Sequence, residues 1–385
     1  MADTLRVGIV ANEVSGDHLA ASLIRALRTK HPDIQFEGMT GPAMAGEGCK
    51  SLAVIDPVMG LAEVLKHLPS LISTRKALFK HFVENPPDVF IGVDAPDFNL
   101  QLETRLRESG IKTVHFVSPT VWAWRQKRVK KVHKAVGLML SIFPFEVDFL
   151  REHDVPVACV GHPLADEIPL ENDATASRER LGIPADVPVI GILPGSRMSE
   201  LKGLSETFIR TAQWCHEREP RLQFVTPLVN ARIREAFESE LERLAPDLPI
   251  HLVDGSSRDA ILSSDQVLTA SGTATLETLL LKRPMVVGYR LHWLTYWLVN
   301  TFDLLKIPHF AMANLLSPEP LAPEFLQDEC NPEQLGPALM ELLNAPERRA
   351  EIRSVYGEIH KHMRLNAAET AAGAVLELIR GRPGS

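Results

Sequence analysis

The sequence has few cysteines, and none of them has a close partner along the chain. No C-x-x-C pair occurs, and no second cysteine lies near any of the thiols. Zinc sites and disulfide frameworks need cysteines at close or regular spacings, and thiols stay reduced in the cytoplasm. We therefore expect neither kind of site, no metal, and a cytoplasmic location. The four cysteines are Cys49, Cys159, Cys215 and Cys330.

Long apolar runs are also missing. The longest uncharged apolar run is Leu291–Phe302, whereas a membrane-spanning helix takes about 20 such residues. The beginning of the chain, MADTLRVGIVA, has no basic segment ahead of a longer apolar core. We therefore expect neither a transmembrane helix nor a signal peptide.

An excess of positive charge is absent as well. The 41 lysines and arginines are outnumbered by 49 aspartates and glutamates, which gives a net charge of −8 when the histidines are neutral. Proteins that bind nucleic acid carry a strongly basic surface or domain. We therefore expect no nucleic-acid partner.

Short apolar runs alternate with helical patterns in both halves of the chain, which is typical of parallel sheets covered on both faces. A chain of 385 residues is long for one core, because single cores stop growing at about 250–300 residues. We predict an α/β protein with two doubly wound, Rossmann-like domains, a cleft between them at the carboxyl ends of the strands, and C-terminal helices. The expected strands are Leu5–Ala11, Gln35–Met39, Asp88–Asp94, Lys112–Val117 and Gly137–Ile142 in the first half, and Val187–Leu193, Leu222–Pro227, Ile250–Val253, Gln266–Ala270 and Met285–Tyr289 in the second.

Prolines and acidic residues interrupt this alternation between Gly161 and Ala185, where we place the boundary between the domains. The first domain is expected to cover residues 1–165 and the second residues 186–331. Residues 332–385 have only helical patterns, and we expect them to pack across the domains or onto a dimer partner.

Two loops that follow strands in the second half carry groups suited to a phosphate. Pro194–Arg197 combines a glycine, whose backbone can approach an anion closely, with an arginine. Ser271, Gly272 and Thr273 precede or open a helix that Ser271 or Thr273 can cap, so that its first amides face a diphosphate. Glu277 lies one turn further on the same face and can accept hydrogen bonds from two ribose hydroxyls. The alternatives are an ordinary strand–helix turn and a capped helix with Glu277 in solvent.

Two carboxylates follow the expected strand Asp88–Asp94. Pro96 keeps Ala95 out of helical geometry, so Asp94 and Asp97 are expected at the carboxyl edge of the sheet. Either carboxylate can accept a proton from the hydroxyl group of an acceptor substrate. The alternative for Asp97 is a structural role as the N-cap of the helix that begins near Phe98.

The first strand–helix turn contains one glycine, Gly16, and is therefore no dinucleotide fingerprint. Glu13 is expected at the mouth of the cleft. Ser15 or Asp17 can cap the helix that follows.

Two stretches indicate contact with lipid. Met59–Phe82 places apolar side chains at helical spacing beside lysines and arginines, as in helices at an anionic lipid interface, and packing on the core is the alternative. Trp122 begins a stretch with six cations within ten residues, Arg125 to Lys134, a patch suited to lipid phosphates. The residues concerned are Val64, Leu65, Leu68, Leu71 and Ile72 in the first stretch, and Trp122, Trp124 and Arg125 in the second.

Eight short motifs follow one another along nearly the whole chain. They are EVSGD (Glu13–Asp17), VDAPDFN (Val93–Asn99), VSPTVWAWRQKR (Val117–Arg128), LPGSR (Leu193–Arg197), PLVNA (Pro227–Ala231), SGTATLE (Ser271–Glu277), MVVGYR (Met285–Arg290) and ANLL (Ala313–Leu316). Together they resemble the motifs of the lipid-A-disaccharide synthases, a family of inverting glycosyltransferases with the GT-B fold.

The resemblance implies a reaction and a role for each candidate residue. The enzyme would join UDP-2,3-diacylglucosamine to 2,3-diacylglucosamine 1-phosphate, giving the β-1,6-linked disaccharide 1-phosphate and UDP, without a cofactor. The second domain would bind the UDP-linked donor and the first the acceptor. Arg197 and the amides of Ser271–Thr273 would neutralise the charge on the departing UDP. Glu277 would hold the ribose, and Tyr289 and Asn314 would close the donor pocket. Asp97 would be the general base, with Asp94 as the second candidate, and Glu13 would orient the sugar or the acceptor.

The same resemblance implies a protein attached peripherally to the inner membrane, on an anionic lipid surface, and its pairing into a homodimer. Two other functions are compatible with the sequence. One is a UDP-sugar 2-epimerase, which also has two such domains. The other is a non-catalytic protein that binds a nucleotide sugar or a lipid.

Overall fold

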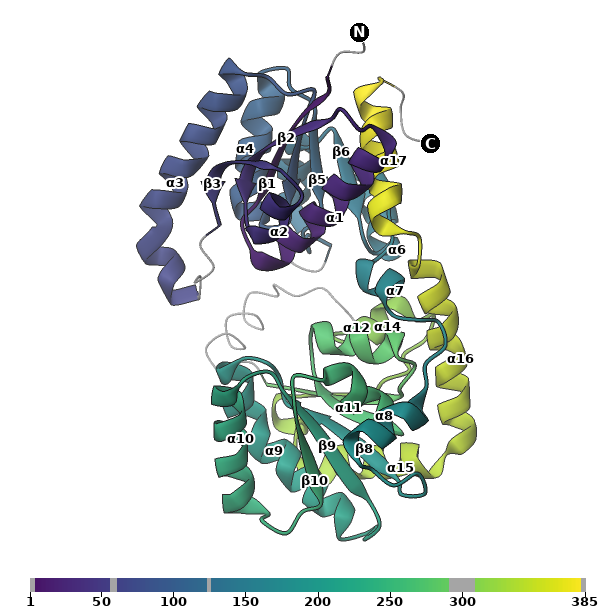
Figure 1. The fold of residues 1–385 in the computed structure, drawn as a ribbon. Helices are drawn as coiled ribbons and strands as arrows, with labels where there is room; N and C mark the ends of the chain where they lie inside the picture. The colour runs from purple at the N-terminus through teal and green to yellow at the C-terminus, as the bar shows by residue number, and fades with distance from the viewer. Residues whose placement is uncertain (1–3, 56–60, 123–125, 291–308, 382–385) are drawn as a thin grey trace. The chain divides into compact units, whose positions relative to one another are not determined.

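A computed structural model describes residues 4–55, 61–122, 126–290 and 309–381, and for residues 61–68 it gives the helix without its side chains (Figure 1). The chain divides into two compact units. Unit 1 comprises Met1–Asp166 and Met363–Ser385, and unit 2 comprises Glu167–His362. Trp124, Arg125 and the apolar run Leu291–Phe302 lie outside the described residues.

Seven strands of the described part of unit 1 form one sheet in the order β3-β2-β1-β4-β5-β6-β7. Every neighbouring pair is parallel. The order reverses between β1 and β4, and ligands of such sheets bind at the carboxyl ends of the strands near this reversal. The strands are β1 (Arg6–Ala11), β2 (Gln35–Thr40), β3 (Lys50–Val54), β4 (Val89–Val93), β5 (Thr113–Phe116), β6 (Leu138–Ser141) and β7 (Val157–Cys159).

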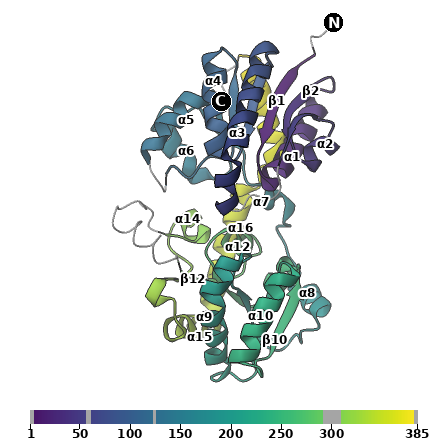
Figure 2. The same cartoon turned by 90° about the vertical axis from the view of Figure 1, so that its left-hand side faces the viewer.

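Helices cover both faces of this sheet (Figures 1 and 2). Helix α1 packs against α2 and α17 on one face, and α4 packs against α3 and α5 on the other. The buried strands β1 and β4 supply the centre of the core, where Phe82 of α3 meets Phe90 edge to face. The helices are α1 (Val14–Lys30), α2 (Pro42–Gly46), α3 (Leu61–Glu84), α4 (Pro96–Glu108), α5 (Val129–Ala135), α6 (Pro144–Arg151), α7 (Pro163–Glu167) and α17 (Ala367–Ile379).

Unit 2 repeats this plan. Six strands of its described residues form a second parallel sheet, β10-β9-β8-β11-β12-β13, whose order reverses between β8 and β11. Helix α9 has α10 on one side and α15 on the other (Figure 2). The strands are β8 (Val189–Leu193), β9 (Gln223–Leu228), β10 (Ile250–Asp254), β11 (Gln266–Ala270), β12 (Met285–Tyr289) and β13 (Glu324–Leu326), and the helices are α8 (Ala174–Leu181), α9 (Met198–His216), α10 (Ala231–Leu244), α11 (Ser257–Ser263), α12 (Thr273–Leu280), α14 (Met312–Leu316), α15 (Pro332–Asn344) and α16 (Pro346–Met363).

The C-terminal helices are divided between the units. Residues 332–362 belong to unit 2, where α15 packs on α9. Helix α17 lies beside α1 in unit 1 (Figure 1). The carboxylate of Asp166 accepts hydrogen bonds from the amides of Asn366 (2.9 Å) and Ala367 (2.6 Å), which ties the start of α17 to unit 1.

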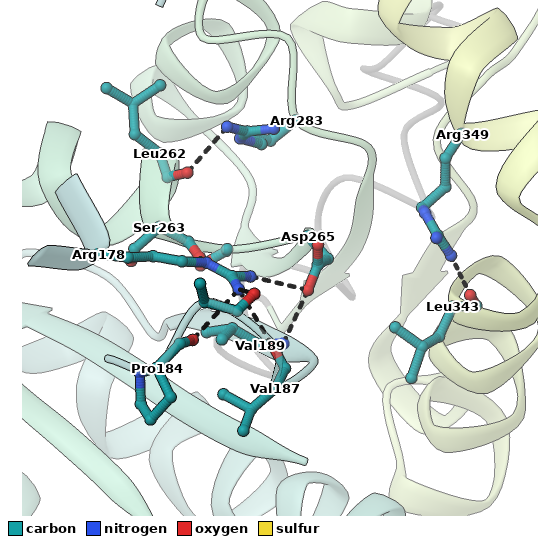
Figure 3. A network of polar contacts seen from close by, with 12 residues as sticks. Arg178, Pro184, Val187, Val189, Leu262, Ser263, Asp265, Arg283, Leu343 and Arg349 are labelled. Carbon is teal, nitrogen blue, oxygen red and sulfur yellow. Dashed lines mark hydrogen bonds and ion pairs between the residues drawn. The ribbon is translucent and has the colours of Figure 1, made fainter. Parts of the chain in front are cut away.

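A partly buried arginine holds the amino ends of two strands in unit 2 (Figure 3). Arg178 of α8 donates to the carbonyls of Ser263 (2.8 Å) and Val187 (3.1 Å) and pairs with Asp265 (3.0 Å). Asp265 also accepts the amide hydrogen of Val189 at 2.9 Å. These contacts join the starts of β8 and β11, and so fix the two strands whose opposite ends carry the candidate phosphate loops.

The start of the first helix differs from its prediction. Helix α1 begins at Val14 with Glu13 as its N-cap, so neither Ser15 nor Asp17 caps it. The buried carboxylate of Asp17 instead accepts hydrogen bonds from three amides at the start of α2, at 2.8–3.0 Å. The three amides belong to Gly41, Ala43 and Met44.

Candidate functional site

One cavity of about 550 Å³ opens at the carboxyl ends of the strands of unit 2. The loops after β8 and β11 contribute the candidate phosphate residues, and these two strands are neighbours at the reversal of the sheet. Six residues predicted from the sequence line this one cavity: Arg197, Ser271, Gly272, Thr273, Glu277 and Tyr289.

The loop after β11 depends on a glycine. Gly272 has φ 124° and ψ −154°, a conformation essentially restricted to glycine, and it is the N-cap of α12. The prediction that Ser271 or Thr273 caps this helix is wrong, because Ser271 uses its hydroxyl elsewhere, donating to the carbonyl of Phe310 at 3.1 Å. The first amides of α12 are therefore left without a side-chain cap, at the rim of the cavity.

Glu277 is held in place on the cavity wall. The hydroxyl of Ser257 lies 3.2 and 3.3 Å from its two carboxylate oxygens, and the guanidinium of Arg258 lies 3.5 Å from one of them. Its side chain is 19% exposed, which leaves part of the carboxylate open to the cavity. A pre-oriented carboxylate of this kind suits a pair of neighbouring hydroxyls.

Asn314 does not line the cavity. Its buried side chain donates to the carbonyl of Ala322 (2.7 Å) and to Glu324 (2.6 Å), and it accepts the amide hydrogens of Leu321 and Ala322. Asn314 therefore organises the segment that leads into β13. Glu324 also accepts the amide hydrogen of Phe310, and Phe310 does line the cavity.

Four cavity residues were missed by the sequence analysis: Glu200, Gly255, Ser257 and Phe310. Glu200 is the third residue of α9 and accepts the amide hydrogen of the N-cap residue Arg197, but an arginine at the N-cap does not give the serine or threonine signature of a capping box. Gly255 and Ser257 follow β10, and no chemical pattern marks them. Burial raises the pKa of the Tyr289 phenol; the negative charge of Glu200 adds to that rise, and the positive charge of Arg197 opposes it.

In unit 1 the end of β4 carries the two aspartates in an unusual turn. Asp94 and Ala95 both have left-handed backbone conformations, with φ of 52° and 43°. Asp94 accepts the amide hydrogen of Ala95 at 2.8 Å. The N-cap of α4 is Ala95, so the alternative role of Asp97 as N-cap is wrong; Asp97 is the second residue of the helix. Its carboxylate is 87% exposed and pairs with Arg128.

The buried side chain of Asn99 stabilises this turn. The side-chain amide of Asn99 donates to the carbonyls of Val93 (3.2 Å) and Asp94 (2.8 Å). One turn further along α4, Glu103 is fully buried and lies 2.7 Å from His115 Nδ1 of β5. Left-handed geometry costs about 1 kcal/mol or more at a non-glycine residue, and these buried contacts offset that cost.

Glu13 follows β1, the neighbour of β4 at the reversal of the first sheet. Glu13 and the Asp94–Asp97 turn therefore lie on adjacent strand ends of unit 1. This edge carries the acidic candidates, whereas the cavity in unit 2 carries the anion-binding candidates.

Trp122 belongs to a group of aromatic side chains at the same edge of unit 1. Its indole N–H donates to Glu146 at 3.1 Å, and its ring meets that of Phe145 edge to face. Glu146 is 2% exposed and also accepts a hydrogen bond from Ser141 at 2.6 Å. Burial raises the pKa of the Glu146 carboxyl to about 7.

Glu146 is expected to make the stability of the protein depend on pH. Because its pKa is higher in the folded than in the unfolded chain, its contribution is complete below about pH 4.5 and is lost as pH rises through about 7. Between pH 5 and 8, the wild type should lose about 2–3 kcal/mol of unfolding free energy relative to Glu146→Gln, which stays neutral. Urea titrations at several pH values measure this difference. Glu152→Gln, an exposed neighbour, is the control, and an equal trend in both variants would contradict the assignment.

The apolar stripe of the first half lies on α3. Leu71 is partly buried and packs against the core of unit 1, whereas Ile72 is 37% exposed. The side chains of Val64, Leu65 and Leu68 lie outside the described part of the chain. None of the helices within the described ranges combines the length and the apolar character that crossing a membrane requires.

Proteins of known family resemble this chain over its whole length. A family model described as lipid-A-disaccharide synthetase matches residues 7–377. A lipid-A-disaccharide synthase from Pseudoalteromonas translucida is 50% identical over 377 residues, covering 97% of each chain. One from Pseudomonas aeruginosa (strain UCBPP-PA14) is 49% identical over 384 residues, covering 99% of this chain and 100% of the relative.

Solved structures share the fold at low sequence identity. A glycosyltransferase from Rickettsia africae superposes with a TM-score of 0.61 at 11% identity, covering 99% of each chain. An S. aureus MnaA–UDP co-structure superposes with a TM-score of 0.63 at 12% identity, covering 98% of this chain and 97% of the other. The prediction of a GT-B-like α/β fold with two parallel-sheet domains is confirmed.

Proposed function

The chain belongs to the lipid-A-disaccharide synthase family and is a glycosyltransferase of lipid A biosynthesis, and we propose its substrates and the residues that act on them. The donor is UDP-2,3-diacylglucosamine and the acceptor is 2,3-diacylglucosamine 1-phosphate. The products are the β-1,6-linked disaccharide 1-phosphate and UDP. The configuration at the anomeric carbon of the donor inverts.

The observation that carries the proposal is the cavity of unit 2. It gathers an arginine, two glycine-containing loops and a carboxylate at neighbouring strand ends. Arg197 and the amides that begin α12 are suited to the diphosphate, whose charge grows as UDP departs. Glu277 receives the ribose hydroxyls, and Tyr289 closes the pocket. Asn314 stabilises the adjoining segment that leads into β13.

The acceptor is proposed to bind at unit 1. Asp97 takes the proton from the 6-hydroxyl, because its carboxylate is exposed and held by Arg128 at the carboxyl end of β4. Asp94 is the second candidate, since one of its oxygens already accepts a backbone hydrogen bond. Glu13 orients a sugar from the neighbouring strand end.

The direct test supplies both diacylated monosaccharides and follows disaccharide and UDP together. Equal molar amounts of the two products are expected. The same enzyme should leave UDP-N-acetylglucosamine unchanged when no acceptor is present. Formation of a 2-epimer under that condition would support an epimerase, the activity named for a structural neighbour from Neisseria meningitidis that has a TM-score of 0.61 and 14% identity. Binding of UDP without any product would indicate a non-catalytic protein.

The protein is proposed to act at the cytoplasmic surface of the inner membrane, because both substrates carry acyl chains. Helix α3 supports contact with that surface through exposed Ile72 and through the cations Lys76 and Lys80 on the following turns. Trp122 and the cations around it are the second candidate contact. Pairing into a homodimer stays a prediction from the family resemblance.

Replacing Ile72 by aspartate is expected to weaken the sedimentation of the protein with anionic vesicles by about three- to tenfold, since it removes apolar contact and adds like charge. Val83→Asp is the matched control, because Val83 is 44% exposed on the last turn of the same helix. Equal sedimentation of both variants and the wild type would assign this face of α3 to solvent.

A further inference from the structure

A carboxylate of the protein occupies the loop that follows β8. Glu200, in the first turn of α9, accepts the amide hydrogens of Ser196 (3.0 Å) and Arg197 (3.2 Å) on one oxygen. Its other oxygen lies 3.5 Å from the guanidinium of Arg197. All three residues line the cavity of unit 2.

The loop is shaped around this carboxylate. Gly195 has φ 114°, and a β-carbon at that position would lie 2.5 Å from Glu200 Oε2. A larger residue would therefore collide with the carboxylate as well as being strained. The sequence suggests that Gly195 makes room for a phosphate. In the structure, Gly195 already makes room for an anionic group of the protein itself, the carboxylate of Glu200.

Glu200 engages the side chain of Arg197, which the proposed donor site assigns to the diphosphate, and two amides of the glycine-containing loop that lines the same cavity. Backbone amides at a helix start and an arginine bind phosphate oxygens and carboxylate oxygens by the same charge-assisted hydrogen bonds. A second anion at this loop would have to share these donors with Glu200 or replace it, and like charges at such distances repel.

We propose that Glu200 is an internal competitor of the nucleotide's diphosphate. The inference rests on the donor site proposed above. On binding, the diphosphate takes the amides of Ser196 and Arg197, and Glu200 turns away. The side chain of Arg197 is 80% exposed, so its pairing with Glu200 is weakly held and the guanidinium is free to follow the phosphates.

This competition has a consequence for turnover. Glu200 lowers the affinity for every ligand that places phosphates in the loop, including the product UDP. It leaves the affinity for the uridine portion alone unchanged. The enzyme thereby binds its product less tightly than the cavity would otherwise allow, which favours release.

The test compares Glu200→Gln with the wild type, with UDP and uridine as the titrated ligands in calorimetry. Glutamine can still accept both amide hydrogens through its carbonyl oxygen but carries no charge. UDP should bind Glu200→Gln about tenfold more tightly, as expected from removing one like charge. The dissociation constant for uridine should not change. Glu206→Gln removes a charge from the same helix further from the cavity and is the matched control, with UDP affinity as in the wild type.

Glu200→Ala adds a second measurement, because it frees the amides and removes the helix cap together. It should also bind UDP more tightly, although its melting temperature falls. If Glu200 serves only as a cap, Glu200→Gln binds UDP as the wild type does and Glu200→Ala binds it more weakly; that pair of results overturns the inference alone. Failure of the wild type and of every variant to bind UDP overturns the donor site and the inference with it.

Discussion

Asp97→Asn is expected to lower turnover by about a thousandfold, because a general base contributes about 10²–10⁴-fold and asparagine cannot accept the proton. Asparagine has the same shape, so the contact with Arg128 changes little in geometry. The affinity for UDP should stay as in the wild type, since the donor cavity belongs to unit 2 and Asp97 to unit 1. Steady-state rates with both lipid substrates and calorimetry with UDP measure the two quantities.

Asp94→Asn is the matched control for this experiment. The side-chain oxygen of asparagine can keep the hydrogen bond from the amide of Ala95, so the turn is retained. A smaller loss of turnover than that of Asp97→Asn is expected. If Asp94→Asn is the more damaging variant, Asp94 is the base. Turnover near the wild-type rate in both variants would remove the base from this turn altogether.

Glu103→Ala is expected to lower the free energy of unfolding by about 3–5 kcal/mol, as does the removal of one partner from a buried pair. Glu103 and His115 are both fully buried, with 2.7 Å between the carboxylate oxygen and Nδ1. The alanine leaves the imidazole of His115 without that partner and opens a cavity beneath the turn of Asp94. Urea unfolding followed by circular dichroism measures the loss.

Two further variants distinguish loss of the pair from loss of helix surface. Glu108→Ala lies on the same helix in solvent and should change the stability by no more than about 0.5 kcal/mol. The double variant Glu103→Ala/His115→Ala should lose less than the sum of the two single losses, because both remove one interaction. Strictly additive losses would show that the two side chains do not stabilise each other.

The central strands and the edge strand β10 could be predicted from the sequence, and the other three edge strands could not. Strands β4 and β8 are buried along their whole length, so each is a continuous apolar run with a clear signal. The strand β3 lies at the edge of its sheet and is largely exposed, and the edge strands β7 and β13 have three residues each. Short or half-exposed edges need no apolar run, and their hydrogen bonds come from a partner strand far along the chain.

The candidate site divides in the same way. Arg197, Thr273 and Glu277 could be predicted because each stands in the loop or helix turn directly after a predicted strand. The place of Asn314 could not, because its four hydrogen bonds are made with a segment whose path no local pattern describes. The role of Asp17 could not be predicted for the same reason, since its carboxylate accepts amide hydrogens at the start of another helix, α2.

By itself, the sequence determined the alternation of strands and helices, the division into two sheets, and the positions of the chemical groups along the chain, because burial and turn geometry act over a few neighbouring residues. Only the tertiary structure decided what each group touches. Glu200 on the phosphate loop and Glu103 against His115 are contacts of charge and shape that form once the sheets are built. Such contacts produce no periodic pattern in the sequence, because they depend on which strand ends become neighbours in the folded protein.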